Sequence, residues 1–200
     1  LVDCSNIWIG TYMKGLCRLN KKGNLQQVGK EIIGDGYISN IAKDADDNLW
    51  LVVGNRIFVI ESNEKNKLVT DSILPKEITR PMTRPNSDIA SLIITSSGIV
   101  WVATLGNGIY KISPKSDYNI EHFTRNDGLL SNYILSIVED DNGFLWVTTN
   151  CGLMSMNANT GEICNRINDY ESHKNGSQQA SYKLSTGDLL IGGVKGIDYF

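Results

Sequence analysis

The four tryptophans of this chain fall on one column of an imperfect repeat, and this spacing constrains the fold more than any other feature. They are Trp8, Trp50, Trp101 and Trp146, separated by 42, 51 and 45 residues, and Leu190 takes the column 44 residues later. Each lies in a short apolar segment such as Asn48–Val53 (NLWLVV). Self-similarity at a period of roughly 20 to 50 residues is typical of repeat architectures.

Other columns share the same phase. The residue two positions after the anchor is small or β-branched: Gly10, Val52, Ala103, Thr148 and Gly192. A glycine–aliphatic pair follows in four repeats: Gly15-Leu16, Gly108-Ile109, Gly152-Leu153 and Gly196-Ile197. The second repeat has Arg56-Ile57 there, so we expect Asn55 to supply the positive-φ turn residue. Aliphatic residues also lie 12 and 9 positions before three tryptophans: Ile38 and Ile41, Ile89 and Leu92, Ile134 and Ile137.

Turn signals separate these columns. They are Asp46–Asn48, Ser96–Gly98, Asp141–Gly143 and Ser185–Gly187. Each repeat therefore predicts a strand, a tight turn, the Trp strand, a glycine turn, a third strand and a weaker fourth strand, for example 119–123 or 162–167. No stretch has helical periodicity. Four short antiparallel strands every 45 residues or so are typical of a β-propeller blade.

The predicted fold class is therefore all-β, a β-propeller fragment with three full four-stranded antiparallel blades and two partial blades. The expected blades span 1–32 (partial), 33–86, 87–130, 131–175 and 176–200 (partial). The Trp segments are apolar on both faces, whereas a half-exposed strand would alternate. We expect the indole rings to be wedges between stacked blades, each contributing about a few kcal/mol by burial. The small residue two positions on would leave room for the neighbouring blade.

The pattern resembles the two-component regulator propeller repeat, most closely in Asp127–Leu153 (DGLLSNYILSIVEDDNGFLWVTTNCGL). The family consensus begins Gly-Leu-x-x-Asn-x-Ile and ends Leu-Trp-Ile-Gly-Thr-x-x-Gly-Leu. The resemblance implies the extracytoplasmic sensor of a hybrid histidine-kinase receptor, often one that controls glycan use in gut bacteria. It also implies further blades and downstream signalling domains in a longer parent chain. Because open propellers leave unpaired edges, we expect the fragment to self-associate.

Composition excludes several other classes of function. The formal charge is −3, with 19 basic and 22 acidic residues spread along the chain, so we expect no nucleic-acid partner. No apolar run is long enough to cross a bilayer, and we expect no membrane contact by this segment. The cysteines Cys4, Cys17, Cys151 and Cys164 form no CxxC pair, and the acidic turns lack EF-hand spacing. We therefore expect neither a metal site nor a cofactor.

Candidate ligand-binding residues lie in two sets of loops that gather on one face of a propeller, those after the Trp strands and those between blades. The candidates are Tyr12, Lys14, Tyr37, Asn55, Arg56, Arg84, Asn107, Tyr133, Asn150 and Lys195. Aromatic surfaces with amides and cations suit a sugar or a uronic acid. No catalytic group is evident, because His122 falls in a predicted outer strand and His173 in a polar loop.

Three functions remain open from the sequence. The first is a periplasmic ligand-sensing region that recognises an oligosaccharide or related solute and is not itself an enzyme. The second is a non-enzymatic scaffold for protein contacts or receptor dimerisation. The third is a propeller lyase, which would require a catalytic histidine on the channel face.

Overall fold

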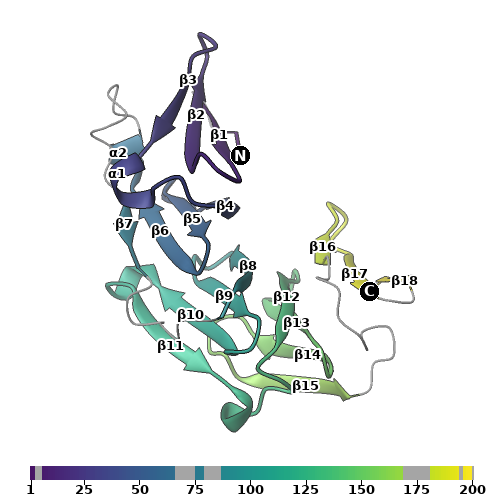
Figure 1. The fold of residues 1–200 in the computed structure, drawn as a ribbon. Helices are drawn as coiled ribbons and strands as arrows, with labels where there is room; N and C mark the ends of the chain where they lie inside the picture. Colours follow the sequence, from purple (N-terminus) through teal and green to yellow (C-terminus); the bar gives the residue numbers. More distant parts are fainter. Residues whose placement is uncertain (3–5, 66–74, 79–86, 169–180, 194–195, 200) are drawn as a thin grey trace. The chain divides into compact units, whose positions relative to one another are not determined.

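The structure is a computed structural model of the 200-residue chain, and it describes residues 1–2, 6–65, 75–78, 87–168, 181–193 and 196–199. Its strands form three four-stranded and two three-stranded antiparallel sheets, each a simple meander in chain order (Figure 1). This result confirms the predicted all-β class and its blade pattern. The chain divides into two compact units, Leu1–Thr83 and Arg84–Phe200.

The first unit holds two sheets, β1-β2-β3 and β4-β5-β6-β7. Its elements are β1 (Asn6–Gly10), β2 (Leu16–Asn20), β3 (Leu25–Val28), α1 (Lys30–Ile33), β4 (Ile38–Lys43), β5 (Leu49–Val53), β6 (Arg56–Ile60), α2 (Ser62–Lys65) and β7 (Lys76–Glu77). The Trp strand is β1 in the first sheet and β5 in the second. The core of this unit lies between the sheets, where Trp8 packs with Leu49, Leu51 and Phe58.

The second unit holds the other three sheets. Its elements are β8 (Ile89–Ile94), β9 (Val100–Thr104), β10 (Ile109–Ser113), η3 (Pro114–Ser116), β11 (Asn119–Phe123), η4 (Arg125–Asp127), β12 (Ile134–Glu139), β13 (Phe144–Thr149), β14 (Gly152–Asn157), β15 (Ile163–Asn168), β16 (Ser181–Lys183), β17 (Leu189–Gly193) and β18 (Gly196–Tyr199). Strand β12 contacts β8 and β9 of the preceding sheet and β16 of the following sheet, so consecutive sheets of this unit are neighbours.

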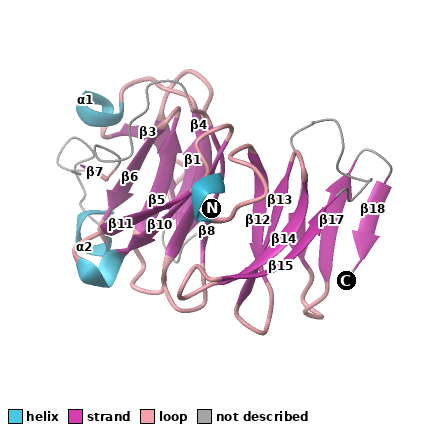
Figure 2. Ribbon diagram, turned by 90° about the horizontal axis from the view of Figure 1, so that it is seen from below, coloured by secondary structure: helices cyan, strands magenta, loops and turns pink. Residues whose placement is uncertain are grey.

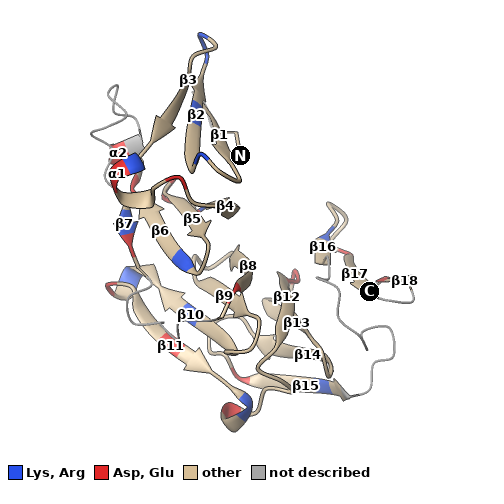
Figure 3. Ribbon diagram, in the orientation of Figure 1, with Lys and Arg blue, Asp and Glu red and all other residues tan. Residues whose placement is uncertain are grey.

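Helix is confined, among the described residues, to two four-residue α-helical turns and two three-residue 3-10 turns (Figure 2). None of these has the length and apolar character that a membrane-spanning helix requires. Lys and Arg residues and Asp and Glu residues are interspersed along the strands and turns of each unit (Figure 3). Residues of both charges are therefore spread along the described chain, as the composition predicted.

The hairpin turn before the Trp column has the same backbone hydrogen bonds in four repeats. Each turn begins at the residue six positions before the Trp column: Asp44, Thr95, Asp140 and Leu184. The backbone N–H of this residue donates to the carbonyl of the residue four positions later. Its carbonyl accepts from the N–H of the residue three positions later. The third residue after it has positive φ in each case: Asp47 (66°), Gly98 (83°), Gly143 (78°) and Gly187 (95°). Glycine at three of these positions adopts this conformation without a steric penalty, which explains the turn signals in the sequence.

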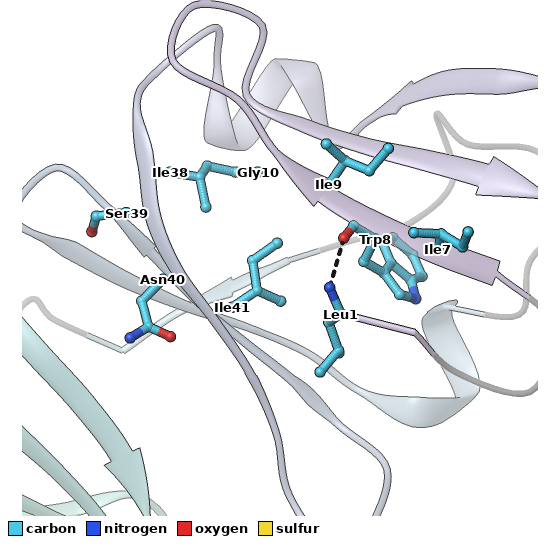
Figure 4. A pocket seen from close by; sticks show the side chains of 9 residues that line it. All are labelled: Leu1, Ile7, Trp8, Ile9, Gly10, Ile38, Ser39, Asn40 and Ile41. Carbon is cyan, nitrogen blue, oxygen red and sulfur yellow. Dashed lines mark hydrogen bonds between the residues drawn. The ribbon is translucent and has the colours of Figure 1, made fainter. Parts of the chain in front are cut away.

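Burial differs among the four indole rings. Trp8, Trp50 and Trp101 are at most 1% exposed, whereas Trp146 is half-buried. The small residue two positions on does make room for a neighbouring sheet at Gly10, where a Cβ would lie 2.7 Å from Cγ2 of Ile38, in the pocket lined by β1 and β4 (Figure 4). The predicted burial of the indole ring is therefore found at three of the four tryptophans, and Trp146 is less buried than the other three.

The prediction for the turn between β5 and β6 was wrong by one residue. Gly54 has the positive φ of 61°, and Asn55 does not. Glycine takes this position because the absence of a Cβ removes the steric penalty that asparagine would still meet there.

Candidate ligand-binding loops

A threonine three residues after the tryptophan organises the loop that follows the Trp strand. Thr11 Oγ1 accepts a hydrogen bond from Lys14 N (2.8 Å) and donates to the Gly15 carbonyl (2.8 Å). Thr104 does the same with Asn107 N (3.0 Å) and the Gly108 carbonyl (2.8 Å). In the fourth repeat, Thr149 joins Cys151 N (3.0 Å) and the Gly152 carbonyl (2.9 Å). The role of this threonine column was not predicted from the sequence, although threonine recurs at the same position in three repeats.

Glycine is required where each of these loops ends. Gly15, Gly108 and Gly152 have φ values of 56°, 75° and 141°. A Cβ at these positions would collide with the carbonyl oxygens of Gly34, Phe123 and Ile167, respectively. The hydroxyl and the glycine together hold each loop in a defined conformation at the end of its blade.

In the first unit, the structure brings two predicted aromatic residues together. The rings of Tyr12 and Tyr37 have centroids 5.4 Å apart and are tilted by 56°. They are 74% and 50% exposed, so both rings are available to solvent. Tyr12 follows β1 and Tyr37 precedes β4, and the Ile38 N–H donates to the Thr11 carbonyl (3.0 Å) to join the two segments.

Two further candidates belong to the same region of the first unit. Lys14 is exposed in the Thr11–Gly15 loop that carries Tyr12. Asn55 is exposed in the turn after β5, and the neighbouring Gly54 N–H donates to the Tyr37 carbonyl (3.0 Å). An aromatic pair, an ammonium group and an amide are therefore presented by adjoining backbone segments.

Arg56 is engaged within its own sheet instead. Its Nε donates to Oε1 of Glu77 (3.0 Å) and its Nη2 to Oε2 (2.6 Å), and its guanidinium lies 4.6 Å from the Phe58 ring centroid. These hydrogen bonds to the Glu77 carboxylate raise the pKa of Arg56 above its ordinary value. This bidentate pair joins β6 to β7.

In the second unit, Asn107 is also committed to internal contacts. Its side chain is 7% exposed, and Nδ2 donates to the Tyr110 hydroxyl. The Asn107 carbonyl oxygen lies 2.6 Å from Nε2 of His122, and the His122 ring stacks on Tyr110 at 4.1 Å. His122 lies in outer strand β11, as predicted, where these contacts fix its ring.

Tyr133 and Asn150 remain accessible in the second unit. Tyr133 is 39% exposed, and its carbonyl accepts a hydrogen bond from the exposed Asn150 (N–O 3.3 Å). The preceding Asn132 carbonyl accepts from the N–H groups of Gly106 (3.1 Å) and Gly108 (2.8 Å), which joins this segment to the loop after β9. The candidates Arg84 and Lys195, and His173, lie outside the described residues.

The link between β11 and β12 contains a polar turn with its own hydrogen-bond network. Thr124 and Asp127 form a reciprocal capping box around η4, with Oδ2 of Asp127 accepting from the Thr124 hydroxyl (2.8 Å) and N–H (2.9 Å). These hydrogen bonds lower the Asp127 pKa below its ordinary value. The box shapes the backbone immediately before Asn132 and Tyr133.

The described residues include no group of three or more His, Cys, Asp or Glu side chains placed to hold a metal ion. Within the same ranges, Cys17 is a buried free thiol and Cys151 and Cys164 are exposed free thiols. The exposed groups of the candidate residues in these loops are aromatic rings, amides and an ammonium group.

Comparison with known proteins identifies the repeat. The two component regulator propeller family matches residues 128–151. No protein of curated function matches the chain in sequence.

Solved structures of low sequence identity share the fold. One is the extracellular domain of BT4673 from B. thetaiotaomicron, which is named as a one component system in one structure and as a hybrid two component system in another. The first of these structures matches at a TM-score of 0.72 and 18% identity, over 99% of this chain and 26% of that chain. Virginiamycin B lyase from Staphylococcus aureus matches at 0.72 and 17% over 100% and 68%. The extracellular domain of BT3049 from B. thetaiotaomicron matches at 0.56 and 18% over 98% and 32%. The chain thus spans about a quarter of the BT4673 domain.

Proposed function

We propose that this chain is part of a ligand-sensing propeller in a hybrid two-component receptor. The proposal starts from the match of residues 128–151 to the two component regulator propeller family. The similarity to two extracellular domains of such systems supports a location outside the cytoplasm, and we assign it to the periplasm. The proposed ligand is an oligosaccharide or a related solute, and the region binds without catalysis. The remaining blades and the signalling domains belong to the parent chain.

The observation that carries this proposal is the exposed Tyr12–Tyr37 pair. Large aromatic rings that remain open to solvent at the ends of ordered loops suit recognition better than packing. A sugar ring presents an apolar face that can lie on such rings, while its hydroxyl or carboxylate groups can bond with amides and cations. Lys14 and Asn55 supply those groups on the adjoining segments.

The position of the pair also offers a route to signalling. Tyr12 follows a strand of the first sheet and Tyr37 precedes a strand of the second sheet, so a ligand on both rings contacts two blades. A ligand shifts an equilibrium only by its difference in affinity between the two arrangements. A solute that bridges the two tyrosines would favour the arrangement in which both rings reach it, which couples binding to blade packing.

The test is a glycan array followed by calorimetry on the intact sensor, with Tyr12→Ala and Tyr37→Ala as variants. We expect each variant to weaken binding by about tenfold or more, since about 1.4 kcal/mol of lost contact corresponds to a factor of ten. Tyr182→Ala is the matched control, because Tyr182 is also an exposed tyrosine (65%) but belongs to strand β16 and not to these loops. It should bind within about twofold of the unchanged sensor. Equal losses in all three variants, or no binding across broad solute classes, would instead favour a scaffold role.

A further inference from the structure

The turn between β12 and β13 contains an asparagine followed by a glycine, Asn142-Gly143. Asn142 is exposed, and its side-chain amide forms no hydrogen bond with any residue that the structure describes. Its backbone N–H donates to Oδ1 of Asp140 (2.9 Å), which holds the residue in the turn. The Gly143 N–H lies 3.4 Å from the Asp140 carbonyl oxygen, longer than an ordinary hydrogen bond. The side-chain amide and the next backbone nitrogen are therefore both available to react.

An asparagine beside a glycine can react with water in two steps. The glycine nitrogen attacks Cγ of the asparagine, because no Cβ on the glycine shields that nitrogen. The new N–Cγ bond closes a succinimide ring while the Cγ–Nδ2 bond breaks, and Nδ2 leaves as ammonia with the proton of the glycine N–H. Water then opens the ring. Attack at Cγ gives aspartate, whereas attack at the backbone carbonyl gives isoaspartate, whose main chain runs through Cγ.

Another Asn-Gly pair in the described ranges, Asn107-Gly108, is held by its surroundings. Asn107 is only 7% exposed, and its Nδ2 donates to the Tyr110 hydroxyl. The Gly108 N–H donates to the Asn132 carbonyl (2.8 Å). Both reacting groups are thus bonded within the fold at this pair, which makes it an internal comparison for Asn142-Gly143.

The turn with the open pair contacts both neighbouring sheets of the second unit. The Gly143 carbonyl accepts from the Ala158 N–H (2.9 Å), and the Ala158 carbonyl accepts from the indole of Trp101 in the preceding sheet (3.0 Å). Asp141 pairs with Lys183 of the following sheet (2.5 Å). Isoaspartate lengthens the main chain just before Gly143 and so displaces its carbonyl. Either product also adds a carboxylate beside Asp141, and the two like charges repel each other.

We propose that Asn142-Gly143 is a modification site where asparagine converts, without an enzyme, to aspartate and isoaspartate, and that this conversion weakens the contacts among the three sheets of the second unit. Water is the co-reactant and ammonia is released. The rate rises with pH, because the attacking nitrogen must lose its proton. The site shares no residue with the Tyr12–Tyr37 pair, so it goes beyond the proposed sensing function.

The test is peptide mapping by mass spectrometry of the 200-residue chain, incubated folded at mildly alkaline pH. We expect the peptide that contains Asn142 to show conversion of an amide to an acid, with part of the product labelled by isoaspartyl methyltransferase. The peptide that contains Asn107 should convert about tenfold or more slowly, because a buried group reacts only after local opening. In urea the two sites should convert at similar rates, since unfolding removes the protection of Asn107.

Two outcomes would overturn the modification site. One is an equal rate at Asn142 and Asn107 in the folded chain. The other is an Asn142 that stays unmodified in the folded chain although it converts in urea. The pair Asn175-Gly176 lies outside the described residues and is followed as a separate peptide.

Thermal midpoints test the effect on the sheets. After incubation the unchanged chain should lose about 2–4 °C, the shift expected in a chain of this size when one hydrogen bond is weakened. Asn142→Gln is the matched control and should keep its midpoint, because glutamine forms the corresponding larger ring far more slowly. Asn142→Asp should show only part of the loss, since it adds the charge without lengthening the main chain. An equal loss in the unchanged chain and in Asn142→Gln would overturn the link between the modification and sheet packing.

Discussion

Trp101 and Trp146 occupy the same column of neighbouring sheets, yet their indole N–H groups bond in different ways. Trp146 Nε1 donates to Oδ2 of Asp140 (3.0 Å), six residues earlier in its own hairpin turn. Trp101 has Thr95 at that position, and its Nε1 donates instead to the Ala158 carbonyl (3.0 Å), in the turn after β14 of the next sheet. In the first unit, Trp50 repeats the carboxylate arrangement with Asp44 (2.9 Å).

The difference shows how one short side chain changes the role of a conserved position in the repeat. A carboxylate reaches the indole and satisfies it within the blade, whereas the threonine hydroxyl is used locally, accepting from the Ile99 N–H (3.1 Å). A buried indole N–H left without an acceptor would be costly, so Trp101 bonds across the blade boundary. The same residue thus stabilises a single hairpin in two repeats and joins two sheets in a third.

The largest expected effect is the contrast between Trp101→Ala and Trp146→Ala. Trp101 is fully buried and packs against Leu145, Val147 and Met154, so its loss should lower the free energy of unfolding by about 3–5 kcal/mol. Trp146 is half-buried, and its truncation should cost clearly less. Urea denaturation followed by circular dichroism would measure both. Trp101→Phe is the control that keeps most of the volume, and equal losses for the two alanine variants would contradict the comparison.

A smaller effect should distinguish the two turns. Asp140→Ala removes the acceptor for three donors, the N–H groups of Asn142 and Phe144 (both 2.9 Å) and the Trp146 indole. We expect a loss of about 1–3 kcal/mol, because these donors lose their partner. Thr95→Ala removes a hydroxyl that bonds only within its own turn, with the Ile99 N–H (3.1 Å), the Ile99 carbonyl (3.1 Å) and the Ser97 hydroxyl (3.0 Å), and no indole loses its acceptor. We therefore expect a smaller cost of about 1 kcal/mol.

Thermal midpoints and tryptophan emission would follow both turn variants. Asp140→Asn retains one side-chain oxygen and should fall between Asp140→Ala and the unchanged chain. A larger loss in Thr95→Ala than in Asp140→Ala would show that the carboxylate is not what sets the two turns apart.

Much of the fold could be predicted from the sequence because the repeat signals are local and redundant. The Trp column, the aliphatic residues nine positions earlier and the turn glycines all indicate the same strands, and the expected strand 119–123 coincides with β11. The placement of Gly54 rather than Asn55 at positive φ was missed, because both residue types are common in such turns and only the backbone geometry separates them.

The candidate site could be predicted only in outline. The adjacency of Tyr12 and Tyr37 follows from loops meeting where blades join. The engagement of Arg56 does not, because its partner Glu77 lies in a two-residue strand that no periodicity marks. The burial of Asn107 depends on contacts with Tyr110 of β10 and His122 of β11. The sequence around Asn107 does not show which side chains of these two strands will reach the loop.

The smallest expected effect concerns the exposed contacts that join consecutive hairpins. Glu139 accepts from Ser96 N (2.7 Å) and Oγ (2.9 Å) of the preceding sheet, and Lys183 pairs with Asp141 (2.5 Å) in the same relation. Both contacts join equivalent positions of the repeat. Glu139 and Lys183 lie seven residues before the Trp column of their own sheet, and Ser96 and Asp141 lie five residues before the Trp column of the preceding sheet. Because Asp141 is 67% exposed, Lys183→Asp should cost only about 0.2–1 kcal/mol.

Two measurements test whether the stability cost of Lys183→Asp comes from the lost ion pair: its dependence on salt, and its recovery when both charges are reversed. The cost of Lys183→Asp should shrink as ionic strength rises, because salt screens exposed charges. The double variant Asp141→Lys with Lys183→Asp should recover most of the lost stability, as it restores opposite charges at the same two positions. Thermal midpoints of the single and double variants at low and high salt would provide the double-mutant cycle. A cost that is independent of salt, or a double variant no more stable than the singles, would mean that packing rather than charge pairing joins these two hairpins.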